Sequence, residues 1–308
     1  MKLALVLSAL ISMSPSCCPA AWAQAPTPPP QSPFAGLIAE YLRRDANGHS
    51  PTPGEIAAMA TLQPQPDASS IWEAMPYLLK ALDNPDAALH AFALSAIAGL
   101  QSTAADVARP AAQLSYKDDV ARALTSGIPK ISEHLTSEES TENRLLVATI
   151  LGGFTPHPPA AVYPPLLDYL KRDDGTGPVG VAVVGDLLQI APLTTDTTSA
   201  IIRYVRRSDQ TSDSRSSLID MIASTTNQSQ AVNKALLLYL DSDDDSVRAR
   251  VILSLPQLDL APEVLADTRA QIDRIVNDSN ENLQVVTAAK SIAACWTAVR
   301  MTAGCPVY

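Results

Sequence analysis

An apolar pair spaced four residues apart recurs along this chain at a nearly constant interval, and this repetition constrains the fold more than any other feature. The second member of the pair, here called the anchor, is in turn Leu82, Leu135, Leu170, Val205, Leu240 and Val276. Four residues before each anchor stand Leu78, Ile131, Leu166, Ile201, Leu236 and Ile272. The anchors are 53, 35, 35, 35 and 36 residues apart. A period near 35 residues is typical of repeat proteins built from helix pairs.

One repeat, residues 232–258, has the pattern of two amphipathic helices joined by an acidic turn. One stripe of the first helix carries Val232, Leu236, Tyr239 and Leu240. A stripe of the second helix carries Val247, Val251, Leu255 and Leu258. Such a helical hairpin cannot bury its apolar side alone, so neighbouring hairpins must stack. The sequence therefore predicts an all-α fold, an α-solenoid of about six to seven antiparallel helical hairpins.

Further local features refine this prediction. The residue before the anchor is Tyr169, Tyr204 or Tyr239 in three successive repeats. Near the start, Ile38, Tyr41 and Leu42 have the same pattern and indicate a seventh, degenerate hairpin. The turns are expected near residues 83, 137, 173, 208, 243 and 278. Residues 101–117 form an insertion that accounts for the long first interval, and we expect either an extra helix or a long loop there.

The turn and the second helix resemble those of HEAT-type repeats, over roughly residues 34–300. In one repeat Asp83 and Asp86 form the turn, and alanines and leucines follow at helical spacing. In another, Asp243 lies in the turn and a valine-arginine pair that includes Arg248 opens the second helix. The arginine position is occupied by Arg144 and Arg215 in two further repeats and by His90, Gly180 and Gln284 in the others. The resemblance implies stacked antiparallel helices whose turn aspartates and arginines form a ladder between neighbours.

The first 33 residues lack the repeat pattern and consist of an apolar leader followed by a proline-rich segment. Lys2, an apolar run at residues 3–13 and the small-residue site ending at Ala23 are the pattern of a secretory signal peptide over residues 1–23. Cys17 and Cys18 lack the preceding leucine of a lipoprotein anchor. Residues 24–33 are proline-rich and predict an extended linker before the solenoid domain, residues 34–308. No later segment is apolar for the ~20 residues of a membrane helix, so we expect an exported, periplasmic or secreted chain without a membrane span.

The charge of the chain excludes one class of partner. The formal net charge is −10, and loss of Lys2 with the leader makes it −11. Proteins that bind nucleic acid need clustered lysine and arginine, and the nearest approach to a cluster is the pairs Arg43-Arg44 and Arg206-Arg207. These pairs are expected at helix C-termini, where cations interact favourably with the helix dipole. The sequence therefore favours a protein or peptide partner and no nucleic acid, and it indicates no oligomeric state.

Three short patterns suggest chemistry, and each has a structural interpretation. Gly175, Gly177 and Gly180 match a dinucleotide-binding motif, with Asp196 at the distance of a ribose contact, but a helical stripe precedes them where the motif needs a strand. The start of a calcium loop is matched by Asp241, Asp243 and Asp245, but the loop's glycine and distant glutamate are missing. Histidines His49, His90, His134 and His157 are scattered. We expect no cofactor, no metal site and no catalytic residue, and we expect the turn aspartates to cap helices.

Two functions remain open at this stage. The favoured one is an exported, non-enzymatic scaffold whose second helices form an extended binding surface for a protein or peptide. The alternative is an exported enzyme, such as a hydrolase, with a site assembled from distant repeats. HEAT-type repeats are generally binding platforms, so the resemblance favours the scaffold.

The two cysteines of the mature chain, Cys295 and Cys305, lie in the expected C-terminal cap, residues 295–308. An even number of cysteines in an oxidising compartment favours a disulfide. Gly304 and Pro306 allow the tail to fold back across an uncovered end face that carries Ile292, Trp296 and Val299. The bridge should stabilise this end by about 2 to 3 kcal/mol. Exported protein should begin at Gln24 and gain the mass of two hydrogens on reduction. An intact-mass measurement that shows two free thiols would contradict the cap.

Overall fold

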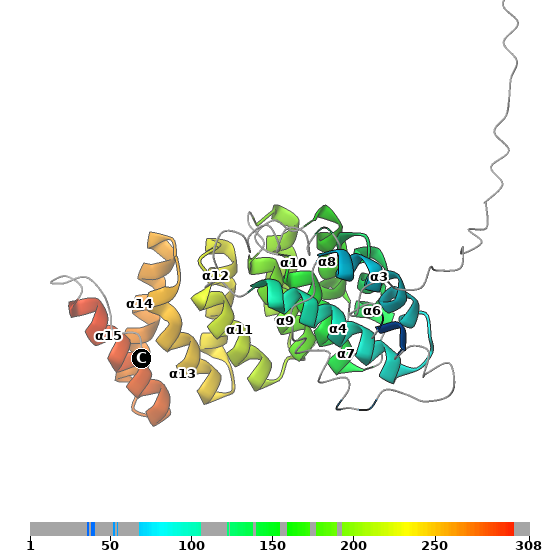
Figure 1. Cartoon of the computed structure of the whole chain (residues 1–308). Helices are drawn as coiled ribbons and strands as arrows, with labels where there is room; N and C mark the ends of the chain where they lie inside the picture. Colours follow the sequence, from blue (N-terminus) through cyan, green and yellow to red (C-terminus); the bar gives the residue numbers. More distant parts are fainter. Residues whose placement is uncertain are drawn as a thin grey trace, which may run out of the picture.

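The structure is a computed structural model, and it describes residues 36, 38–40, 52, 54, 68–105, 122, 124–137, 140–154, 159–172, 177–189 and 193–298. Every regular element in these ranges is a helix, and they contain no strand. The all-helical fold predicted from the apolar periodicity is therefore confirmed for this part of the chain. Figure 1 shows the helices side by side in a row that ends at α15.

The structure defines twelve α-helices and three short 3-10 helices among the described residues. In chain order they are α3 (Ala68–Ala81), α4 (Ala87–Ala105), α6 (Ile128–Ser137), α7 (Thr141–Gly152), α8 (Tyr163–Lys171), α9 (Pro178–Gln189), α10 (Thr195–Val205), α11 (Ser212–Ser224), α12 (Gln230–Leu236), α13 (Asp245–Ser254), α14 (Pro262–Asn277) and α15 (Leu283–Ala298). Short 3-10 helices are η1 (Ala160–Val162), η2 (Leu237–Asp241) and η3 (Leu255–Gln257). The expected turns near residues 83, 137, 208, 243 and 278 lie where α3 gives way to α4, α6 to α7, α10 to α11, η2 to α13 and α14 to α15, whereas residue 173 lies outside the described residues.

Short polar side chains before several second helices explain where these helices begin. Each accepts a hydrogen bond from a free backbone N–H of the first turn. The acceptors and their donors are Asp86 with Ala88 (2.8 Å), Ser140 with Asn143 (3.4 Å), Thr211 with Ser214 (3.2 Å) and Asp244 with Ser246 (2.8 Å) and Val247 (3.2 Å). The expectation that turn aspartates cap helices is therefore confirmed at Asp86 and Asp244.

The helices pack in two rows. The second helices α4, α7, α9, α11, α13 and α15 each pack on the next, and the first helices α6, α8, α10 and α12 do the same. Contacts between the rows join α3 with α4, α6 with α7, α8 with α9 and α14 with α15. The anchors and their partners four residues earlier are buried in one continuous apolar core, apart from the half-buried Val276. Burial of each such side chain stabilises the fold by roughly 1.5 to 3 kcal/mol.

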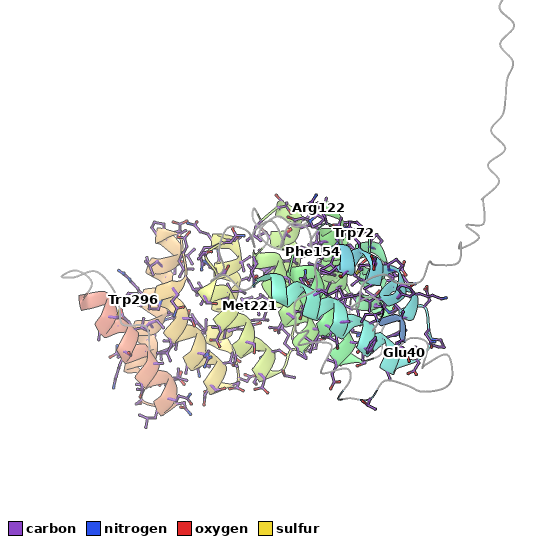
Figure 2. The ribbon with its side chains drawn as sticks, viewed as in Figure 1. Glu40, Trp72, Arg122, Phe154, Met221 and Trp296 are labelled. Carbon is purple, nitrogen blue, oxygen red and sulfur yellow. The ribbon has the colours of Figure 1, made fainter. Side chains whose placement is uncertain are left out.

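Glycines let the second helices approach closely. A Cβ atom would lie 2.0 Å from Asp186 Oδ1 at Gly152, 2.5 Å from Gln101 Cδ at Gly153 and 2.5 Å from Met221 Sδ at Gly185. Real Cβ atoms do not come this near to other atoms, so each glycine accommodates a side chain of a neighbouring helix. Figure 2 shows Met221 on α11, the helix next to α9. This part of the second-helix row therefore requires residues without side chains.

The recurring tyrosines are buried, and two of them bond back to the preceding repeat. Their exposed fractions are 1 % for Tyr169, 0 % for Tyr204 and 6 % for Tyr239. The hydroxyl of Tyr239 is 2.8 Å from the carbonyl oxygen of Val205, the preceding anchor, and 2.9 Å from Gln210 Oε1. The hydroxyl of Tyr204 donates to the carbonyl of Gly177 at 3.2 Å. Burial raises the pKa of both hydroxyls, so both remain protonated donors.

Two details differ from the sequence-based expectations. Helix α4 continues to Ala105, so the first residues of the expected insertion, 101–117, are helical. At the C-terminal end, Ile292 belongs to the apolar core and Trp296 packs against it, whereas we expected both on an uncovered face. The guanidinium of Arg269 on α14 lies 5.1 Å from the centre of the Trp296 ring. Figure 2 shows Trp296 on α15, the last helix. The large apolar side chain that is exposed on this helix is Leu283.

Several expectations fall on other parts of the chain. The signal peptide, the linker, the rest of the insertion and Cys305 lie outside the described residues. The predicted bridge between Cys295 and Cys305 therefore stays a prediction. In the part of the chain that the structure describes, no helix has both the length and the apolar character needed to cross a bilayer.

Replacement of Tyr239 by phenylalanine should destabilise the fold by about 1 kcal/mol, because it removes a buried hydroxyl and leaves the Val205 carbonyl without this donor. The free energy of unfolding in urea measures the effect. Tyr163→Phe is the matched control, since no hydroxyl hydrogen bond of Tyr163 is present among the described residues, and it should change stability by less than about 0.5 kcal/mol. Equal effects of the two substitutions would contradict the role of the Tyr239 hydroxyl.

Candidate functional site

One edge of the row carries the turn residues that the sequence singled out. Asp83, in the turn after α3, pairs with Lys130 on α6, with Oδ1 2.5 Å from Nζ. The hydrogen bond from Lys130 to Asp83 is the main cause that raises the pKa of the lysine. Asp86 caps α4, as described above. The first predicted turn therefore contacts the next helix pair through Asp83 and its own second helix through Asp86.

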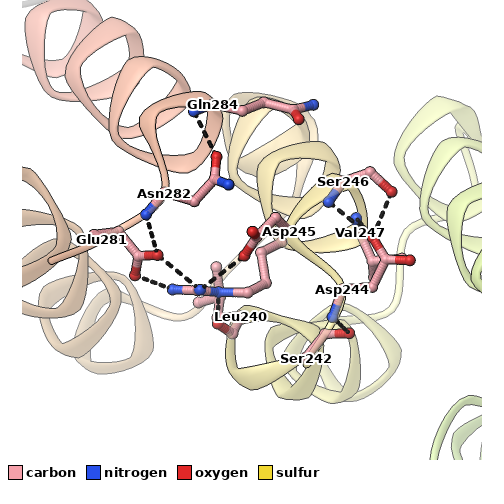
Figure 3. Close-up of polar contacts among 10 residues, drawn as sticks. Leu240, Ser242, Asp244, Asp245, Ser246, Val247, Glu281, Asn282 and Gln284 are labelled. Carbon is pink, nitrogen blue, oxygen red and sulfur yellow. Dashed lines mark hydrogen bonds and ion pairs between the residues drawn. The ribbon is translucent and has the colours of Figure 1, made fainter.

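Arg248 on α13 contacts three elements, and Figure 3 shows its acceptors Leu240, Asp245 and Glu281 with the contacts drawn as dashed lines. Its Nε donates to the carbonyl of Leu240 at 3.2 Å, and Nη1 donates to Asp245 Oδ1 at 3.3 Å. The same Nη1 lies 2.8 Å from Glu281 Oε1, and Nη2 donates to Glu281 Oε2. The side chains are 18 % exposed at Arg248 and 12 % at Glu281. This bidentate ion pair connects one repeat to the turn of the next repeat.

Glu281 was not among the residues predicted from the sequence. Hydrogen bonds from Arg248 hold the pKa of its carboxyl below the ordinary value of 4.5. Its Oε1 also accepts from the backbone N–H of Asn282 at 2.8 Å. Because the folded-state pKa is lowered, the stabilisation is fully present above the ordinary glutamate pKa and is lost as the pH falls through the lowered value. The position of Glu281 in the turn one repeat after Arg248 could have identified it as the partner of this arginine.

The other two predicted arginines make different contacts. Arg215 on α11 donates from Nη2 to the carbonyl of Ser208 at 3.1 Å, and its guanidinium lies 5.9 Å from the centre of the Tyr239 ring. Arg144 is half-buried near the start of α7. The adjacent turns are joined by Arg207, whose Nη1 donates to the carbonyl of Arg172 at 2.6 Å. Contacts between neighbouring turns therefore exist, but their chemistry changes from repeat to repeat.

The acidic turn before α13 is organised around Asp244 rather than Asp243, which is exposed. Hydrogen bonds from the side chains of Ser212 and Ser246 hold the pKa of Asp244 well below its usual range. Ser212 belongs to the preceding repeat, so Asp244 also connects neighbours. Asp241 accepts from Gln271 on α14 at 3.2 Å.

Two of the three carboxylates of the suggested calcium loop bond to different partners, Asp241 to Gln271 and Asp245 to Arg248. Within the described ranges, no three His, Cys, Asp or Glu side chains form a group that could hold a metal ion.

The structure brings together two histidines that lie far apart in the sequence. The rings of His90 on α4 and His134 on α6 are 4.9 Å apart between centres and meet edge to face at 71°. His134 is 6 % exposed, and His90 Nε2 bonds to the carbonyl of Asn84. This pair holds the turn of one helix pair against the next. No motif spacing could have revealed it, because 44 residues separate the two positions.

The solvent side of the second helices forms a second candidate region, which we call the second-helix face. It consists of exposed and half-exposed residues at helical spacing: Thr149 on α7; Ala182 and Gln189 on α9; Ser217, Asp220, Met221 and Ser224 on α11; Arg250 and Leu253 on α13; Thr287, Lys290, Ser291 and Ala294 on α15. Small and hydroxyl-bearing side chains dominate it. Arg250 Nε donates to Asp220 Oδ1 at 2.6 Å, which places α11 and α13 side by side on this face and neutralises both charges.

The opposite solvent side, on the first helices, has a different chemistry, and we call it the first-helix face. Its exposed residues include Asp168 and Lys171 on α8, Asp196 and Arg203 on α10, Lys234 on α12, and Glu263, Asp267, Arg269, Asp273 and Arg274 on α14. A mixture of charges of both signs is the usual composition of a solvated protein surface. Charged side chains are a smaller part of the second-helix face. They are Asp220, Arg250 and Lys290, together with the exposed Glu142 and Asp213 in the first turns of α7 and α11.

No family model, curated protein or solved structure matches this chain. The resemblance to HEAT-type repeats therefore depends on the turn and second-helix residues themselves. The roles of individual residues follow from their geometry in this structure.

The Arg248–Glu281 pair should show a coupling free energy of about 2 kcal/mol in a double-mutant cycle with Arg248→Met and Glu281→Gln, because both charges are largely shielded and share two hydrogen bonds. Urea unfolding at neutral pH provides the four free energies.

The matched control is the Arg250–Asp220 pair, whose side chains are 52 % and 45 % exposed. Its cycle with Arg250→Met and Asp220→Asn should give less than about 1 kcal/mol, since water screens exposed pairs. Coupling energies of similar size in the two cycles would contradict the special role of the contact between repeats.

Proposed function

We propose that this protein is an exported, non-enzymatic scaffold, a HEAT-like α-solenoid that binds a protein or peptide partner on its second-helix face. The observation that carries the proposal is the contrast between the two faces. The second-helix face has mainly small and hydroxyl-bearing side chains, with Met221 and Leu253 among them. The exposed side chains of the first helices are mostly charged, with the apolar exceptions Trp72 and Leu238.

The repeated architecture supports the solenoid part of the proposal. The anchors recur near every 35 residues, and each helix packs mainly on its near neighbours along the chain. Stacked hairpins of this kind present extended surfaces instead of deep pockets. The turn contacts from Asp83 to Lys130 and from Arg248 to Glu281 support a ladder between neighbouring repeats.

The chemistry of the second-helix face supports protein or peptide binding. The centres of protein interfaces are depleted in charge and enriched in aromatic residues, methionine and arginine. Met221 is half-exposed and Leu253 is 49 % exposed, and they lie on the adjacent helices α11 and α13. Small neighbours such as Ser217 and Ala182 allow a partner backbone to approach, and the hydroxyl groups can pair with its amides. Leu253 and Met221 are therefore the proposed apolar anchors of the interface.

Leu253 and Leu238 allow a matched test, because their exposed fractions are 49 % and 51 % but they lie on different helices, α13 and η2. A photoreactive amino acid would replace each leucine in turn, in mature protein expressed in its native cells. Leu253 should crosslink to one discrete partner, identified by mass spectrometry, and Leu238 should not. Leu253→Asp should weaken binding of that partner about tenfold, which corresponds to 1.4 kcal/mol.

Two controls make the test decisive. Leu238→Asp should leave the affinity unchanged, and both aspartate variants should keep the wild-type circular dichroism spectrum. Equal crosslinking at both positions, or no crosslink at Leu253, would show that the second-helix face is not the binding surface.

A further inference from the structure

A carboxyl group sits in the contact between the central second helices. Asp186 on α9 lies against Gly152, the last residue of α7, and fills the place where a Cβ atom of residue 152 would be, 2.0 Å from Oδ1. Its Oδ2 is shielded from solvent and has no hydrogen-bond partner among the described residues. A buried, unpartnered oxygen is costly, and the cost is far larger for an ionised carboxylate than for a neutral carboxyl. The position beside the C-terminal end of α7 adds to this cost, because the helix dipole disfavours a negative charge there.

Among the described residues, no cationic side chain is found to pair with this carboxyl. The charged side chains on the helices packed against α9 are Glu142 and Arg144 on α7, Asp168 and Lys171 on α8, Asp196 and Arg203 on α10, and Asp213, Arg215 and Asp220 on α11. The tyrosines on these helices are Tyr163, Tyr169 and Tyr204. None of these groups contributes to the shift of the Asp186 pKa, which burial alone raises to about 7. The nearby polar side chain at the same end of α7 is the neutral Gln101, packed on Gly153.

We propose that Asp186 makes the joint between α7 and α9 sensitive to pH. The neutral carboxyl packs against Gly152 and lets the two helices approach. The ionised carboxylate requires water, so its formation opens the contact locally. The joint is therefore tight in mildly acidic solution and loosens in alkaline solution.

The direction of the effect on stability follows from the same group. The folded-state pKa of about 7 lies above the ordinary value of 3.8. Between these values the folded chain holds a proton that the unfolded chain has lost, so stability falls as the pH rises. The contribution of Asp186 is complete below the ordinary aspartate pKa and is lost as the pH passes through about 7.

Urea unfolding of the mature chain at pH 5 and pH 8 tests the proposal. Asp186→Asn keeps the shape of the neutral side chain but cannot ionise. Over this pH range the unfolding equilibrium constant of the wild type should rise by roughly 10- to 100-fold more than that of Asp186→Asn. Asp186→Ala should show the same flattened pH dependence, whatever its absolute stability, so a loss of packing cannot imitate the result.

A control and a local measurement complete the test. Asp267→Asn removes an exposed carboxylate on α14 and should retain the wild-type pH dependence. Hydrogen exchange, corrected for intrinsic rates, should accelerate at pH 8 in the last turn of α7 in the wild type and remain slow in Asp186→Asn. Identical pH dependence in the wild type and Asp186→Asn, or exchange that does not differ between them, would overturn the proposal.

Discussion

The structure depends on one constraint, which is that a helix pair with a single apolar stripe must cover that stripe with another helix pair. The buried anchors and the residues four positions before them meet this constraint from α3 to α14. Successive second helices pack on each other along the row. The apolar core is therefore elongated along the row and not gathered at one centre. The same constraint explains why a period in the sequence appears as a row in space (Figure 1).

Polar contacts then determine how neighbouring pairs are placed. The hydroxyl of Tyr239 bonds to the carbonyl of Val205, one repeat earlier, and Arg248 bonds to Glu281, one repeat later. Apolar packing is tolerant of small sliding movements, whereas buried hydrogen bonds and ion pairs are satisfied only in one register. These contacts have different chemistry in different repeats, which explains why a weak sequence motif is compatible with a regular packing pattern.

The fold could be predicted to a large extent because its signal is periodic. The anchors, the tyrosines and the turn positions all follow from spacing, and the structure places them as expected. The sequence analysis singled out Asp243 in this turn, whereas Asp244 caps α13. Several adjacent aspartates could cap the helix, and only the backbone geometry determines which one does. His90 and His134, and likewise Asp186 and Gly152, meet across helices, so no local spacing reveals them. From the sequence we expected a binding surface on the second helices. The difference between the exposed side chains of the two faces, on which that proposal rests, follows only from the burial of individual side chains in the structure.

The arrangement of joints has a mechanical consequence. The extensive contacts in the described part of the chain connect only near neighbours along the row. Joints in such an arrangement act in series, so a small rotation at any one of them is carried to every helix beyond it, and the displacement grows with distance. A rotation at the contact between α7 and α9, near the middle of the row, would move the helices from α11 to α15 together as one rigid body. The softest joint therefore limits the stiffness of the row, however well the others are packed.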